Sequence, residues 1–266
     1  MMPMAAGRAR FVTALAIPLS AGIGMLPMTW SRAADEAPVY ASKAEFHFIR
    51  LEYVDLFTSR RGWGRGWWMQ DWPAAEIHFA QGIRRLTRLD IGEWRHLRIT
   101  DDRIFEYPWV YATQVGYWDL SDAETARLRE YLLRGGFLVV DDFHGPEDWA
   151  VFRETMQRVF PKRPILDIDA EHPMMHVLYD IRERTQIAGL RHLRIGPGGT
   201  TFVQPQATPP LWRAIYDDQD RMVVAINFNM DIGDAWEHAD LPQYPEPMTG
   251  LAYRFGINYI IYSMTH

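Results

Sequence analysis

Residues 128–145 read LREYLLRGGFLVVDDFHG and carry the strongest structural signal in the chain. The pair Gly135-Gly136 is typical of the end of a helix, because glycine adopts the left-handed conformation that a helix terminus often needs. The run from 137 to 140 is apolar without a break, which predicts a strand buried on both faces. Such strands lie inside parallel sheets that helices cover on both sides. The segment therefore predicts a central parallel strand that leads directly into Asp141 and Asp142.

Segments on either side repeat this alternation of strands and helices. Ser121 and Glu124 form a capping box, which predicts the start of the helix that ends before Gly135. Hydrophobic spacing and turn residues predict the other elements. In chain order we expect a strand at 45–54, a loop at 60–72, a helix capped by Asp71 with Pro73 just inside it, a strand at 108–115, helices at 148–160 and 173–179, a loop at 196–210, a hairpin at 212–229 and a closing helix at 248–262. The prediction is a single α/β domain over residues 44–262, with a mostly parallel central sheet between helices.

Composition narrows the possible functions. The 266 residues are 48% hydrophobic and 23% charged, as in an ordinary globular protein. A formal net charge of −6 argues against nucleic acid as a partner, because phosphate contacts need a basic surface. The chain has no cysteine, which excludes disulfides, thiolate zinc sites and cysteine nucleophiles.

The first 33 residues have the pattern of a secretory signal peptide. Arg8 and Arg10 precede an apolar stretch at 11–28, and the small residues Ser31 and Ala33 follow at the spacing of a signal-peptidase site. We expect cleavage near Ala33 and a periplasmic or secreted mature protein. An uncleaved N-terminal anchor is the alternative, although prolines and glycines interrupt the apolar stretch. No later apolar run is long enough to span a bilayer, so we expect no stable transmembrane helix in the mature chain.

Four blocks in order resemble a known bacterial family. They are YPWVYATQVG at 107–116, the 128–145 segment, HPMMHVLYDI at 172–181 and DIGDAWE at 231–237. Together they are similar to the domain of unknown function 4159 (DUF4159), and the resemblance covers roughly residues 44–262. It implies a three-layer α/β sandwich of the flavodoxin-like, class I glutamine amidotransferase-like kind. It implies no activity, because none is established for that family.

The same resemblance points to the turn after the central strand. In amidotransferase-like enzymes a helix, two glycines and a buried strand lead to a sharp turn that carries the nucleophilic cysteine. Here the corresponding residues are 141–145, DDFHG, so acidic residues fill the nucleophile position. We therefore expect no glutaminase activity. No G-x-S-x-G motif offers a serine instead.

Asp141, Asp142 and His144 are the first candidates for a ligand site, since ligands of open α/β sheets bind beyond the carboxyl ends of the strands. Two adjacent carboxylates repel each other, so we expect a cation or a protein donor to hold at least one of them. The alternative is structural: one aspartate caps the helix that begins near Asp148, and the other is solvated.

Further candidates lie downstream. His172 and His176 are four residues apart, as in some metal sites, and Asp141, Asp142, His144, His172 and His176 would form the metal-binding set. The alternative, which we favour, is that His172 sets up the turn before Pro173 and His176 packs.

Asp231, Asp234 and Trp236 follow the second hairpin strand and could meet the Asp141 loop across the same sheet edge. The alternative is an acidic surface loop held in place by Trp236.

A tryptophan-rich segment is the last candidate. Its indole rings could stack on sugars beside the carboxylates or could cover one end of the core, and we favour the second use. The residues concerned are Trp63, Trp67, Trp68 and Trp72.

Three functions remain open at this point. The first is a non-catalytic module of the cell envelope that binds a protein or a glycan, which the missing nucleophile favours. The second is a metal-dependent hydrolase in which a divalent cation activates water beside the acidic turn 141–144 and His172. The third is a degenerate scaffold. Convergence of Asp141, His144, His172 and Asp231 within ligand distance would favour the hydrolase.

Overall fold

The computed structural model describes residues 44–56, 66–196, 201–203 and 209–266, which belong to one compact unit. The expected signal peptide and Trp63 lie outside the described residues. None of the helices that the described part contains combines the length and hydrophobicity needed to cross a bilayer.

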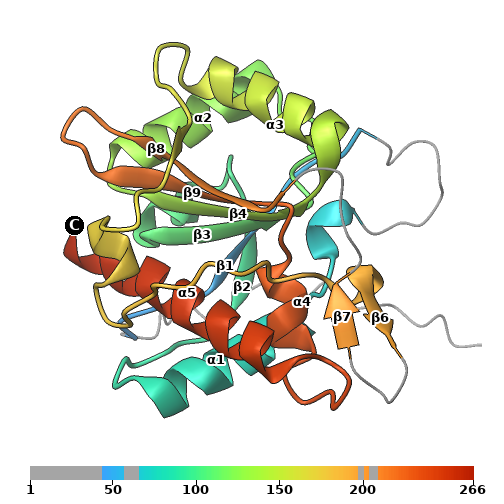
Figure 1. The fold of residues 1–266 in the computed structure, drawn as a ribbon. Helices are drawn as coiled ribbons and strands as arrows, with labels where there is room; N and C mark the ends of the chain where they lie inside the picture. The colour runs from blue at the N-terminus through green and yellow to red at the C-terminus, as the bar shows by residue number, and fades with distance from the viewer. Residues whose placement is uncertain (1–43, 57–65, 197–200, 204–208) are drawn as a thin grey trace, which may run out of the picture. The chain divides into compact units, whose positions relative to one another are not determined.

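A seven-stranded sheet forms the middle of this unit, in the order β2-β1-β3-β4-β9-β8-β5 (Figure 1). Five neighbouring strands are parallel, and they are β2 (Arg95–Arg98), β1 (Ile49–Glu52), β3 (Trp109–Thr113), β4 (Phe137–Phe143) and β9 (Met222–Phe228). Strand β8 (Leu211–Tyr216) runs antiparallel to β9, and β5 (Leu166–Asp167) runs antiparallel to β8. The predicted hairpin and the mostly parallel sheet are therefore confirmed.

Helices cover both faces of the sheet (Figure 1). On one face lie α1 (Ala74–Leu86), α4 (Ile232–Glu237) and α5 (Glu246–Thr265), which share one hydrophobic core with the sheet. On the other face α2 (Asp122–Leu133) and α3 (Gly145–Val159) close a second core. Short elements complete the described chain: the 3₁₀ turns Trp67–Met69, Asp102–Glu106, Pro173–Met175 and Leu190–His192, and the hairpin of β6 (Leu193–Ile195) and β7 (Thr201–Val203).

Strand β4 is central and fully buried, as predicted. It pairs with β3 on one side and β9 on the other, and all seven of its residues are buried. It continues three residues beyond the predicted end because Asp141 still pairs with Thr113, and Phe143 with Phe228. Between these pairs the register shifts, and Asp142 takes a positive φ of 48°. The two aspartates thus belong to an irregular strand end and not to the turn after it.

Several local predictions are confirmed and others are wrong. Ser121 and Glu124 make both hydrogen bonds of the capping box, and Gly135 has a φ of 107° at the end of α2. Helix α3 begins at Gly145, three residues before the expected start, and Asp148 accepts a hydrogen bond from the His144 backbone N–H at 2.8 Å. Neither Asp141 nor Asp142 caps this helix.

Three other elements differ from the prediction. Asp71 does not cap α1: its φ is 63°, and only its carbonyl oxygen accepts from the Ala75 N–H, at 3.0 Å. The expected helix at 173–179 is one 3₁₀ turn, because Asn258 of α5 holds the backbone of Met174 and Tyr179 with its side chain. Part of the expected loop at 196–210 forms β7.

Candidate functional site

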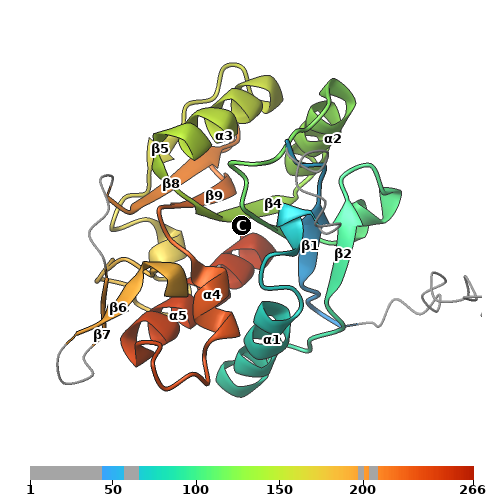
Figure 2. The same cartoon turned by 90° about the vertical axis from the view of Figure 1, so that its right-hand side faces the viewer.

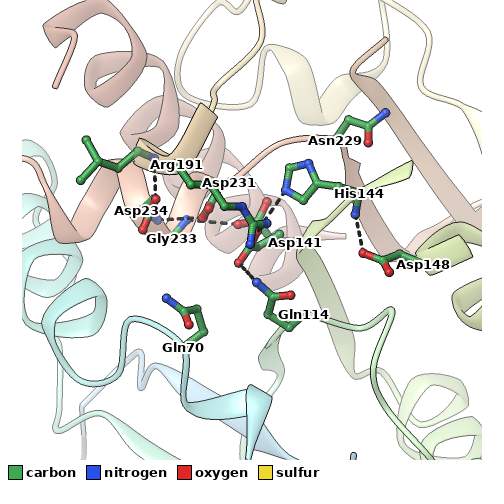
Figure 3. A network of polar contacts seen from close by, with 12 residues as sticks. Gln70, Gln114, Asp141, His144, Asp148, Arg191, Asn229, Asp231, Gly233 and Asp234 are labelled. Carbon is green, nitrogen blue, oxygen red and sulfur yellow. Dashed lines mark hydrogen bonds and ion pairs between the residues drawn. The ribbon is translucent and has the colours of Figure 1, made fainter. Parts of the chain in front are cut away.

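Polar side chains meet where β3, β4 and β9 end and α4 begins (Figure 3). Figure 2 shows the backbone of this region, where the chain passes from β9 into α4. Helix α4 follows β9 after three residues and packs against α1 and α5. Because parallel strands end at the same edge, residues far apart in sequence come together here. We call this region the carboxyl edge.

Asp141 is fully buried at the end of β4. Its Oδ2 accepts hydrogen bonds from the Tyr111 hydroxyl at 2.7 Å and from the backbone N–H groups of Ile232 at 2.8 Å and Gly233 at 3.1 Å. Burial and the charge of Asp142 raise the pKa of Asp141 while its three hydrogen-bond donors lower it, and the resulting pKa is about 7. Asp141 therefore ties β3 and β4 to the start of α4.

Asp142 lies next to it with a side chain that is equally buried. Its Oδ1 accepts from Arg191 at 2.7 Å and from the ring Nε2 of His144 at 3.0 Å, and its Oδ2 accepts from the Gln114 amide (Figure 3). The expectation that a specific partner holds at least one of the two aspartates is confirmed, and protein donors hold both.

Two histidines face each other above Asp142. The rings of His144 and His192 have centroids 4.6 Å apart, and neither Nδ1 atom has a hydrogen-bond partner among the described residues. Burial lowers the pKa of His192, the charges of His144 and Arg191 lower it as well, and the resulting pKa is about 4. His192 is therefore neutral at physiological pH.

A second group of carboxylates lies beside the first. One oxygen each from Asp71, Asp231 and Asp234 lies within 4.8 Å of the others, and all three side chains are buried. Asp231 accepts from the Asp234 N–H at 2.9 Å, and Asp234 accepts from the Leu190 N–H at 2.6 Å. Burial raises the pKa of each of the three, and their mutual charges add to the shift for Asp71 and Asp231. We call these residues the carboxylate trio.

The structure brings together five of the sequence-predicted residues and separates the others. The carboxyl edge contains Asp141, Asp142, His144, Asp231 and Asp234. Trp236 is not a ligand-facing residue: it is fully buried in the core, where it stacks on Phe79 with ring centroids 4.0 Å apart. The reason is that it follows Asp234 by two positions on a short helix and so points to a different side of α4.

His172 and His176 do not join the predicted metal set. The His172 ring lies 5.6 Å from the ring of Tyr216, which pairs with Met222 at the start of β9. Asp141 and Asp142 lie beside the other end of β9, about 20 Å away at about 3.3 Å per residue. His172 instead accepts from the Met174 N–H at 3.1 Å and caps the turn at Pro173, as the structural alternative predicted. That alternative was wrong for His176, which does not pack but is exposed and bonds to Asp180 at 2.6 Å.

Two of the tryptophans differ in their exposure. Trp68 is buried in the core. Trp67 remains partly exposed and stacks on Tyr117 at 4.8 Å. The Tyr117 backbone N–H donates to the Gln114 carbonyl oxygen at 2.9 Å, and the Gln114 side chain donates to Asp142, so this aromatic pair lies near the acidic residues.

Sequence reasoning missed four residues of the site: Asp71, Gln114, His192 and Arg191. Asp71 was interpreted as a helix cap, although its neighbours Trp72 and Pro73 equally suit a loop. Arg191 and His192 lie in an irregular segment without periodicity, and Gln114 follows a strand that carries no other polar signal. Only their positions in space relate them to Asp142.

The mostly parallel sheet between two helical layers defines an α/β protein, and polar groups gather at the carboxyl edge of that sheet. The family model "Domain of unknown function (DUF4159)" matches residues 47–264, and the chain belongs to this family. No curated protein matches the chain.

Proposed function

We propose that this protein is an exported, non-catalytic module of the amidotransferase-like type, which binds an envelope glycan at the carboxyl edge. This proposal rests on the burial and the hydrogen bonding of Asp142. The resemblance to amidotransferase-like enzymes would place the nucleophile at this part of the chain, whereas the Asp142 side chain is about 2% exposed and both of its oxygens are held by donors. A carboxylate held in this way is an anchor and is unavailable to attack a substrate.

The accessible groups around this anchor suit sugar recognition. Arg191 is half exposed while its guanidinium bonds to Asp142, which fixes the direction of its remaining donors. The stacked pair of Trp67 and Tyr117 offers flat aromatic surface beside it. Aromatic faces next to oriented polar groups are the combination that binding sites use for amphipathic rings.

A metal-dependent hydrolase is the second candidate. The pKa of about 7 favours Asp141 as a proton acceptor near neutral pH. However, its side chain is fully buried, and His172 lies at the opposite end of the sheet. A hydrolase would have to use the carboxylate trio in place of His172.

Export rests on the N-terminal pattern of Arg8, Arg10 and the apolar stretch that follows. Mass spectrometry of the protein isolated from its native cells should find a first residue at or near Ala34. A mature protein that begins at Met1 would contradict export by cleavage.

Glycan binding is tested by calorimetric titration of the purified protein with soluble peptidoglycan fragments. We expect saturable binding, and Trp67→Ala should weaken it about 2- to 12-fold, the equivalent of 0.5–1.5 kcal/mol for one aromatic stacking contact. The matched control is Trp94→Ala, because Trp94 precedes β2 at the opposite edge. Absence of binding to the wild-type protein, or an equal loss in both variants, would contradict the proposal. Release of fragment products would favour the hydrolase.

A further inference from the structure

We propose that Asp71, Asp231 and Asp234 bind one hard divalent cation, of the Ca²⁺ or Mg²⁺ type. This inference does not rest on glycan binding, because it concerns the carboxylate trio and its test uses metal ions alone.

The donor set suits such an ion. Three carboxylate oxygens within 4.8 Å of one another offer the oxygen ligands that Ca²⁺ and Mg²⁺ prefer. Two ligands of one ion lie at most twice the metal–oxygen distance apart, which is about 5 Å for Ca²⁺ and about 4 Å for Mg²⁺. The trio is therefore within the reach of Ca²⁺ as it stands.

An unpartnered buried oxygen points into the same space. Asp71 Oδ2 has no hydrogen-bond partner among the described residues, and the side chain is 8% exposed. A Cβ atom added to Gly233 would lie 3.0 Å from this Oδ2 and 3.7 Å from Asp231 Oδ1, so both oxygens face the same point. Leaving such an oxygen unpaired destabilises the folded protein, most of all when the group is charged, and a bound cation would offset that cost.

A second glycine, Gly189, lies close to the same carboxylates and leaves room for them because it has no side chain. A Cβ atom at Gly189 would collide with Asp231 Oδ2 and would lie 3.0 Å from Asp234 Oδ2. The backbone thus approaches the carboxylates closely at two positions where any larger residue would displace them.

Charge balance also calls for a cation here. Within the described residues, no lysine or arginine pairs with Asp71, Asp231 or Asp234. The two nearby arginines are engaged elsewhere, since Arg191 pairs with Asp142 and Arg50 with Glu76. Three buried carboxylates this close can remain ionised together only if a positive charge opposes them. Without the ion they must bind protons instead.

One competing location shares a residue with the trio. Asp234, Glu237 and His238 also lie close enough to hold an ion, on the partly exposed side of α4. The two locations are distinguished by Asp71, which belongs only to the trio, and Glu237, which belongs only to the other group. Neutral variants of these two residues therefore make a matched pair.

The experiment is calorimetric titration of the metal-stripped protein with Ca²⁺, Mg²⁺ and Mn²⁺, together with thermal denaturation with and without each ion. We expect one ion per chain and a metal-dependent rise in melting temperature. Asp71→Asn should weaken affinity by at least roughly tenfold, since even residues behind the ligands typically contribute 10- to 100-fold. Glu237→Gln should bind like the wild type. Stronger binding of Ca²⁺ or of Mg²⁺ would identify the ion.

Two readouts separate lost binding from lost folding. Without metal, Asp71→Asn should melt no lower than the wild type, because the change removes a repelling charge and keeps the shape. Gly189→Ala should also lose the metal-dependent rise. The inference is overturned if millimolar metal neither releases heat nor raises the melting temperature of the wild type, if Asp71→Asn binds normally, or if Glu237→Gln loses as much affinity as Asp71→Asn.

Discussion

The Asp142 side chain joins three separate parts of the chain, around residues 114, 142–144 and 191. A positive φ is uncommon outside glycine, and aspartate is among the residues that tolerate it best. The irregular backbone turns its carboxylate toward Gln114, His144 and Arg191, and all three donate to it. The sequence reveals the two aspartates and His144 but not Gln114 or Arg191, because neither of these two donors lies in a periodic pattern.

Asp142→Asn should lower the free energy of unfolding by about 1.5–3 kcal/mol, the contribution of hydrogen bonds to a charged group. The substituted amide has an N–H₂ group in place of one accepting oxygen, so it would face at least one donor. Chemical denaturation of both proteins measures the difference. The control is Asp218→Asn, whose exposed side chain pairs with Arg163 at the surface and should change stability by less than about 0.5 kcal/mol. Equal effects would mean that Asp142 is not an anchor.

His192 should make the protein less stable in weak acid. Its pKa falls from 6.5 to about 4 in the folded protein, chiefly because of burial, so the unfolded chain takes up the proton first. Its contribution to stability is complete above pH 6.5 and is lost as the pH falls from about 6.5 to about 4. The free energy of unfolding of His192→Gln should therefore decline less over this interval than that of the wild type. Identical pH dependence in both proteins would contradict the assignment.

Among the elements, α4 depends on a residue without a side chain. Gly233 lies in its first turn, where its N–H donates to Asp141, and an added Cβ would lie 2.8 Å from the Tyr111 hydroxyl oxygen. Gly233→Ala should therefore cost about 1–3 kcal/mol, as overpacking usually does. Gly250→Ala is the control, because it lies in α5 with open space around it and should stabilise by about 0.4–1 kcal/mol. Thermal denaturation measures the stability of both variants. A Gly233→Ala variant as stable as the wild type would contradict the packing described for α4.

Elements with strong local signals could be predicted from the sequence, and elements held by distant contacts could not. The central strand and α2 carry their own signals, an apolar run in one case and a capping box in the other. The prediction that Asp71 caps α1 is wrong. Its side chain lies with the carboxylates of Asp231 and Asp234, which are about 160 residues away in the sequence. The turn at 173–175 stays short because Asn258 holds the backbone around it, which no local pattern could indicate.

In the whole molecule, the parallel sheet divides the predicted candidates between its two ends. Asp141, Asp142, His144, Asp231 and Asp234 lie at the carboxyl edge, whereas His172 lies in a pocket with Tyr216 and Tyr262 at the opposite end of β9. Sequence spacing could place each residue near a strand end. It could not say that the connection through 172–187 crosses from the end that holds His172 to the carboxyl edge, where the Ile187 carbonyl accepts from the Asp231 N–H.

Binding at the carboxyl edge is tested most directly by a ¹H–¹⁵N NMR titration of the protein with soluble peptidoglycan fragments. The prediction is that the Trp67 indole N–H and the signals of Gln114 and Arg191 shift saturably, while those around Tyr216 and Tyr262 stay in place. Shifts confined to the pocket around His172, or no shift at any residue, would contradict a ligand site at the carboxyl edge.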